Sequence, residues 1–215
     1  MKIWTYGCSF TSGYNELLFS KHIWPSLLDI GEEYELVNRG YVGLGFHNVR
    51  EFILEDIGRA DKQDLLIIQL PTSNRVVIPY FETIWDSFMR IRDKDPNGTV
   101  SWIKYMKDFD GLVEALGQEA SIVFDLLNRL DLKWMWWSAE KASKSLNKYN
   151  NNRLSINDYD TYEDWIWGNK QYWVDKDKGD WHQNIEGQKA MASTFSKQIK
   201  QYLNNEEAGE GRRSL

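Results

Sequence analysis

The sequence predicts an α/β protein, a three-layer α/β/α sandwich around a mostly parallel sheet of about five strands in the flavodoxin-like order 2-1-3-4-5. Short β-prone runs alternate along the chain with amphipathic segments of helical spacing. The run Leu65–Ile68 is apolar at every position, which is typical of a parallel strand covered on both faces. The first strand begins at Lys2 and breaks at Gly7, so the chain opens directly into the core.

The elements follow in a regular alternation. Strands are expected at Lys2–Tyr6, Tyr34–Asn38, Asp64–Leu70 and Leu132–Trp137. Helices are expected at Asn15–Asp29, with a break at Trp24-Pro25, and at His47–Arg59, Phe109–Leu130 and Asn184–Leu203. In the second of these helices, apolar residues recur with the spacing of one helical face, at Val49, Phe52, Ile53 and Ile57.

Three segments depart from this alternation. Residues 76–108 are rich in aromatic and charged side chains and are expected to form an insertion over one edge of the sheet. Residues 139–170 predict a long loop with short helices, and the polar tail 205–215 is expected to be disordered. The prediction is therefore one domain over residues 1–204.

Composition excludes several classes of protein. A net charge of −6 and a pI near 5.2 argue against a nucleic-acid platform, which would carry a basic surface. The sequence has no apolar run of about 18 residues, and its start lacks the pattern of a secretory signal. The single cysteine, Cys8, excludes an intramolecular disulfide and fits a reducing compartment. A cytoplasmic location is expected, and the oligomeric state is left open.

A serine and a histidine at opposite ends of the chain suggest a hydrolase with a serine nucleophile. Ser9 follows the first strand, where open α/β sheets bind their ligands. A serine hydroxyl needs a base to become a nucleophile, and the base needs an acid to orient it. Of the three histidines, His182 lies just before the last helix, and Asp180 stands two residues upstream on the same side of an extended segment.

These segments resemble the SGNH (GDSL-like) hydrolase superfamily from Ile3 to about residue 192. Gly7-Cys8-Ser9-Phe10-Thr11-Ser12-Gly13 resembles the nucleophile block, with Cys8 in the place of aspartate. Val37-Asn38-Arg39-Gly40-Tyr41-Val42-Gly43 resembles the second block, and the segment from Asp180 to Gln188 resembles the last one. The order and spacing of the blocks carry the resemblance more than any one of them.

The resemblance implies a role for each matched position. Ser9 would be the nucleophile, His182 the general base and Asp180 the acid that orients it. The backbone N–H groups of Ser9 and Gly43, together with Asn74, would form an oxyanion hole. Gly45 is the alternative to Gly43 in the second block. The resemblance implies no metal and no organic cofactor.

Two blocks depart from the family pattern. The third block usually presents Gly-x-Asn-Asp after its strand, whereas this chain reads Gln69-Leu70-Pro71-Thr72-Ser73-Asn74-Arg75. Thr72 or Ser73 could replace Asn74 as the last oxyanion donor, or no side chain does. The last block usually spaces its acid and base as Asp-x-x-His, but here that position is Gly179. Asp175 and Asp177 are therefore alternative acids.

The substrate expected is a small ester. The predicted reaction is hydrolysis of a small acyl group, such as acetyl, from a carbohydrate or a lipid-like alcohol. Trp181 and Trp173 are candidates for the walls of the substrate site, and Arg75 could meet an anionic group, although structural roles are common for such residues. The alternative function is a binding or structural module on the same fold, because the third block is altered.

Overall fold

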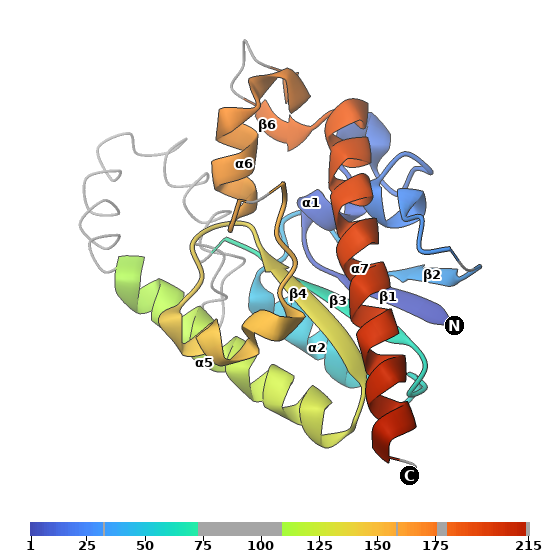
Figure 1. Cartoon of the computed structure of the whole chain (residues 1–215). Coiled ribbons are helices and arrows are strands. Elements are labelled where there is room, and N and C mark those ends of the chain that lie inside the picture. The colour runs from blue at the N-terminus through green and yellow to red at the C-terminus, as the bar shows by residue number, and fades with distance from the viewer. Residues whose placement is uncertain (32, 73–108, 158, 176–179, 214–215) are drawn as a thin grey trace.

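The computed structural model describes residues 1–31, 33–72, 109–157, 159–175 and 180–213. Its main sheet consists of four parallel strands in the order β2-β1-β3-β4 (Figure 1). The strands are β1 (Lys2–Tyr6), β2 (Glu35–Asn38), β3 (Leu65–Leu70) and β4 (Lys133–Ser138). The predicted fold class, a parallel sheet between layers of helices, is confirmed, and β1 is an interior strand as predicted.

The number of strands differs from the prediction, because the described residues contribute four strands to this sheet instead of about five. After β4 the chain returns beside the sheet through η4 (Lys144–Asn152), a run of 3-10 turns. It then pairs with β4 only through a single bridge between Trp136 and Arg153. The consecutive asparagines 150–152 favour turns over strand, which explains why the pairing does not extend.

Apolar side chains that alternate along the strands build a core on each face of the sheet. Met135 and Trp137 of β4 face the first helical layer, which contains α7 (Ile185–Arg213), α6 (Tyr162–Gly168) and η2 (Trp24–Leu27). Trp134 and Trp136 face the second layer, with α2 (Phe46–Asp56), α5 (Phe109–Arg129) and η4. Figure 1 shows α7 crossing one face of the sheet while α2 and α5 cover the other.

Two helices were predicted with the wrong extent. The segment Asn15–Asp29 forms two separate 3-10 turns, η1 (Asn15–Leu17) and η2, because Phe19 between them takes a positive φ of 52°. At the other end of the chain, α7 continues to Arg213, through most of the segment expected to be disordered. Glutamate and alanine at 206–208 favour helix, and the segment contains no proline. The predicted insertion at 76–108 lies outside the described residues.

A small hairpin precedes the last helix. After η5 (Lys170–Tyr172), β5 (Trp173–Asp175) pairs antiparallel with β6 (Asp180–Gln183), matching Trp173 with Gln183. The hairpin stands beyond the carboxyl ends of the main strands, next to α1 (Ser9–Ser12) (Figure 1). This packing brings the two ends of the chain that carry Ser9 and His182 together. No helix in the described part of the chain is long and apolar enough to cross a membrane.

Candidate active site

Ser9 is the first residue of α1, directly after the turn that ends β1. The turn is closed by the carbonyl of Cys8, which accepts hydrogen bonds from the backbone N–H groups of Thr11 at 2.9 Å and Ser12 at 3.0 Å. Ser9 itself is buried, with 1% of its surface exposed. The turn therefore fixes this serine at the carboxyl end of an interior strand, where α/β sheets place their ligands.

Ser9, His182 and Asp180 form a continuous hydrogen-bonded chain. Oγ of Ser9 lies 2.9 Å from Nε2 of His182, and Nδ1 of the same ring lies 2.7 Å from Oδ1 of Asp180. The carboxylate can only accept, so Nδ1 carries the proton and Nε2 is left to accept from the serine hydroxyl. The same carboxylate oxygen also accepts the backbone N–H of His182 at 3.1 Å. This arrangement can transfer a proton from a serine to an imidazole.

The carboxylate that contacts the imidazole is that of Asp180, two residues upstream of His182. Asp175 stands opposite Asp180 across the β5–β6 hairpin, and Asp180 is the carboxylate for which the structure gives a contact with the ring. Asp177 lies outside the described residues. The shorter spacing works because β6 is extended, so the side chains of Asp180 and His182 lie on the same side of the strand.

Aromatic rings surround the imidazole. The ring of Tyr14 stacks on that of His182, with centroids 3.9 Å apart and planes 11° apart, and the Phe10 ring lies 5.1 Å away. Tyr162 in turn stacks on Phe10 at 4.4 Å. Burial, with the charges of Cys8 and Asp180, raises the pKa of Tyr162 well above 10, so its hydroxyl stays neutral.

A buried glutamine that the sequence analysis did not single out supports the nucleophile turn. Gln69, near the end of β3, is fully buried, and its Oε1 accepts the N–H of Cys8 at 2.9 Å and the hydroxyl of Thr11 at 2.7 Å. Its Nε2 donates to Sγ of Cys8 at 3.0 Å. Gly7 makes room for it, since a Cβ there would lie 2.3 Å from Oε1. One polar residue in the apolar run Leu65–Leu70 is the signal that could have identified Gln69.

The loop after β2 is tied to the same turn. The N–H of Tyr41 donates to the carbonyl of Gly7 at 3.0 Å, and Asn38 accepts the N–H of Gly40 at 2.9 Å. Gly43 further along the loop has a φ of +83°, and no atom of the described residues lies within 4 Å of the position that a Cβ would take. Gly45, its alternative, is the N-cap of α2. The conformation of Gly43 is thus one that favours glycine.

The remaining predicted site residues are described only in part. Asn74, Arg75 and Ser73 lie outside the described residues, and Thr72 is half-buried just after β3. Trp181 lies on β6 between Asp180 and His182, and the structure describes its backbone but not its side chain.

Trp173 does not form an exposed wall. It is 6% exposed, and its indole N–H donates to the carbonyl of Ile166 at 2.7 Å, within the core of the first helical layer. The prediction for Trp173 therefore needs correction, because packing under the β5–β6 hairpin buries its ring. Within the residues that the structure describes, no group of three or more His, Cys, Asp or Glu side chains could hold a metal ion.

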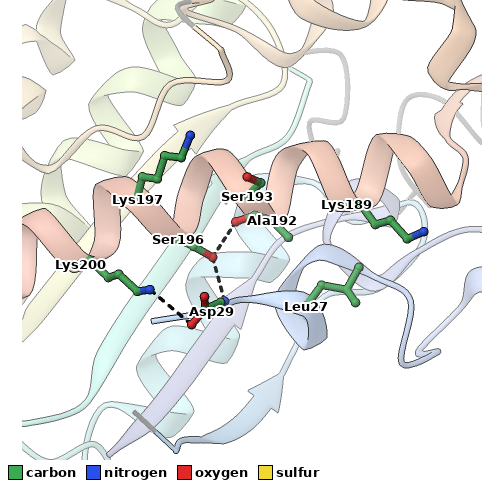
Figure 2. Close-up of a pocket in the computed structure, with 8 residues that line it drawn as sticks. All are labelled: Leu27, Asp29, Lys189, Ala192, Ser193, Ser196, Lys197 and Lys200. Carbon is green, nitrogen blue, oxygen red and sulfur yellow. Dashed lines mark hydrogen bonds and ion pairs between the residues drawn. The ribbon is translucent and has the colours of Figure 1, made fainter. Parts of the chain in front are cut away.

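A groove of about 390 Å³ lies elsewhere, between α7 and the segment that follows η2. Figure 2 shows its lining: Leu27, Asp29, Lys189, Ala192, Ser193, Ser196, Lys197 and Lys200. Ser196 accepts the N–H of Asp29 at 2.8 Å and donates to the carbonyl of Ala192 at 2.7 Å, while Lys200 lies 3.3 Å from the Asp29 carboxylate (Figure 2). These contacts fasten the segment to α7, and none of the lining residues belongs to the chain of bonds at Ser9.

Comparison with known proteins supports the fold alone. No family model and no curated protein matches the sequence. The structure is similar to that of a lipase/acylhydrolase from Enterococcus faecalis, with a TM-score of 0.51, 12% sequence identity, and coverage of 93% of this chain and 95% of that one. It also matches a member of the lipolytic protein G-D-S-L family from Veillonella parvula, with a TM-score of 0.44, 15% identity and coverage of 90% and 94%. The chain therefore shares its fold with the lipase/acylhydrolase from Enterococcus faecalis.

Proposed function

We propose that the protein is a serine esterase that removes a small acyl group from a carbohydrate or a lipid-like alcohol. The observation that carries the proposal is the chain of bonds from Ser9 through His182 to Asp180, at 2.9 and 2.7 Å. These distances lie within the reach that a general base and its orienting acid require. The shared fold with a lipase/acylhydrolase is consistent with it.

In the proposed reaction, Oγ of Ser9 attacks the ester carbonyl while Nε2 of His182 takes the hydroxyl proton. The N–H groups of Ser9 and Gly43, with Asn74, stabilise the oxyanion of the tetrahedral intermediate. The intermediate collapses, the alcohol leaves with the proton from His182, and an acyl-serine remains. Water then attacks the acyl-serine with His182 again as base, which releases the acid and restores Ser9. The reaction as proposed needs no metal or organic cofactor.

The substrate contacts are part of the proposal. Trp181 stands on β6, the strand that carries His182. Arg75 follows β3 in the sequence, and we assign to it a contact with an anionic group of the substrate. We assign to Trp181 a broad apolar contact with the acyl or sugar group. Its replacement by alanine then raises KM more than it lowers kcat, which steady-state kinetics on short acyl esters would measure.

A fluorophosphonate probe, which reacts with activated serines, tests the proposal directly. The wild type should be labelled at Ser9, as located by peptide mass spectrometry, and Ser9→Ala should be neither labelled nor active on acetyl and butyryl esters. The alternative is a binding module on the same fold, favoured by the lack of Gly-x-Asn-Asp after β3. Folded wild-type protein that remains unlabelled and binds an acylated sugar without cleaving it would select that alternative.

A further inference from the structure

The aromatic ring of Tyr14 covers one face of His182, the base of the proposed reaction. Tyr14 and His182 lie 168 positions apart, yet their rings stack with centroids 3.9 Å apart and an interplanar angle of only 11°. Tyr14 is half-buried and contributes to the surroundings of the site without belonging to the bonded chain of Ser9, His182 and Asp180. Neither the sequence blocks nor the proposed mechanism gives it a role.

The backbone holds Tyr14 in this position. Gly13 before it has a φ of +83°, and a Cβ there would lie 2.3 Å from the carbonyl oxygen of Leu17. Two backbone bonds close the loop, from the N–H of Leu17 to the carbonyl of Tyr14 at 3.1 Å and from the N–H of Phe19 to that of Ser12 at 2.8 Å. The glycine therefore turns the chain at the end of α1, and the closed loop keeps the phenol ring over the imidazole.

We propose that Tyr14 is a positioning residue for His182, whose ring face fixes the plane of the imidazole and favours its positively charged form. This inference deepens the proposed function and rests on it for its catalytic consequence. The negative face of an aromatic ring attracts a cation that stacks on it, so the imidazolium formed when Ser9 gives up its proton gains more from Tyr14 than the neutral ring does. An apolar side chain of similar bulk would shield the imidazole from water without that attraction.

Ser9, Phe10 and Asp180, whose contacts with the imidazole the structure describes, meet it in other ways. Asp180 holds Nδ1 from within the plane of the ring, and Ser9 meets Nε2 from α1. Phe10 lies farther away, at 5.1 Å, and is tilted by 38°. Tyr162, the titratable side chain that α6 brings near Asp180, keeps its proton because burial raises its pKa. Asp175 stands across the hairpin from Asp180.

Replacing Tyr14 by leucine and by phenylalanine separates the ring face from bulk and from the hydroxyl. The chain has three histidines, so the Cε1–H resonances can be titrated by NMR, and His182→Gln identifies the resonance of His182. Tyr14→Leu should lower the pKa of His182 by about half a unit, whereas Tyr14→Phe should leave it unchanged. Tyr159→Leu, at a tyrosine whose ring lies against Gly168, is the matched control and should also leave it unchanged.

The second readout is the rate of fluorophosphonate labelling. Tyr14→Leu should slow labelling by about tenfold, with Tyr14→Phe close to wild type. A folded Tyr14→Leu protein with an unaltered titration of His182 would overturn the inference, and so would a Tyr14→Phe protein that behaves like Tyr14→Leu, because the hydroxyl would then be responsible. Wild-type protein that is not labelled at all would defeat the proposed function, while the NMR titration would still decide whether Tyr14 acts on His182.

Discussion

The amide oxygen of Gln69 accepts the backbone N–H of Cys8 at 2.9 Å, which joins the middle of the sheet to the residue immediately before Ser9. The same oxygen accepts the hydroxyl of Thr11 at 2.7 Å, two residues after Ser9. One buried side chain thus spans the turn on both sides of the proposed nucleophile. Its partners are buried, so they have no water to replace it.

Removing this amide should disturb the nucleophile more than the fold. In Gln69→Leu, the N–H of Cys8 and the hydroxyl of Thr11 lose their acceptor, which should lower the free energy of unfolding by about 2 kcal/mol or more. We expect the labelling of Ser9 by a fluorophosphonate to slow at least tenfold, because a small displacement of a reacting group costs up to about 10²-fold.

Gln188→Leu is the matched control for that experiment. Gln188 is also buried, and its Oε1 accepts the backbone N–H of Trp24 at 2.7 Å, so its loss leaves the bonds of Gln69 to the nucleophile turn intact. Urea denaturation should show a similar loss of stability with an unchanged labelling rate. Equal slowing of labelling in the two variants would assign Gln69 a general structural role instead.

The carboxylate at 180 should be essential for rate and not for binding. In Asp180→Asn, the site loses the negative charge that stabilises the imidazolium, and an amide turned so that its NH₂ faces Nδ1 would favour the wrong tautomer of His182. We expect kcat to fall by about 10³–10⁴-fold with little change in KM. Asp175→Asn is the control and should keep most of the activity. The reverse result, with Asp175 essential, would transfer the role of the acid to β5.

Gly43 and Gly31 have nearly the same positive φ, so alanine variants at the two positions can separate the effect of backbone strain on stability from an effect on catalysis. Gly43 and Gly31 have φ values of +83° and +85°, and at both a Cβ would clash with no atom of the described part of the chain. Alanine at either position should cost roughly 1–2 kcal/mol of stability, measured by urea denaturation. If the N–H of Gly43 stabilises the oxyanion, only Gly43→Ala should also lose about 10²-fold in kcat. Full activity in a folded Gly43→Ala protein would remove Gly43 from the oxyanion hole.

Alkaline pH should destabilise the fold through two buried tyrosines. Burial raises the pKa of Tyr6 and of Tyr162 above the ordinary value of 10, with the charge of Asp56 adding to the effect at Tyr6. Below pH 10 both the folded and the unfolded chain keep these protons. Above pH 10 the unfolded chain releases them first, so stability falls as pH rises, by up to about 1.4 kcal/mol per pH unit for each tyrosine.

Urea denaturation at pH 9, 10 and 11 would measure this slope. Tyr162→Phe removes one of these groups and should make the slope shallower, by up to about 1.4 kcal/mol per pH unit. The same slope in this variant and in the wild type would mean that Tyr162 titrates normally in the folded chain.

The parallel α/β architecture was predictable from the sequence, because the mostly apolar segments Lys2–Tyr6 and Leu65–Leu70 are typical of parallel strands that are covered on both faces. It also singled out Ser9, His182 and Asp180, since few residue types can activate a serine. The extent of η1 and η2 and the β5–β6 hairpin were not predictable, because each depends on what the segment packs against and not on its own pattern. The same holds for the number of strands, four, that the described residues contribute to the main sheet.

Only the tertiary structure decided which residues support the site. The sequence shows Gln69 as one polar residue in a strand, and the pairing of β1 with β3 in register makes it the partner of Cys8. In the sequence, Tyr14 is only a residue that follows a glycine. In the structure, β6 packs against α1, and the His182 ring therefore stacks on the ring of Tyr14. Trp173 was predicted to line the substrate site, but packing against residues distant in the sequence buries its ring in the core. Local sequence specifies which groups can react, whereas long-range packing specifies which groups hold them, because hydrogen bonds and ring contacts join residues that are distant along the chain.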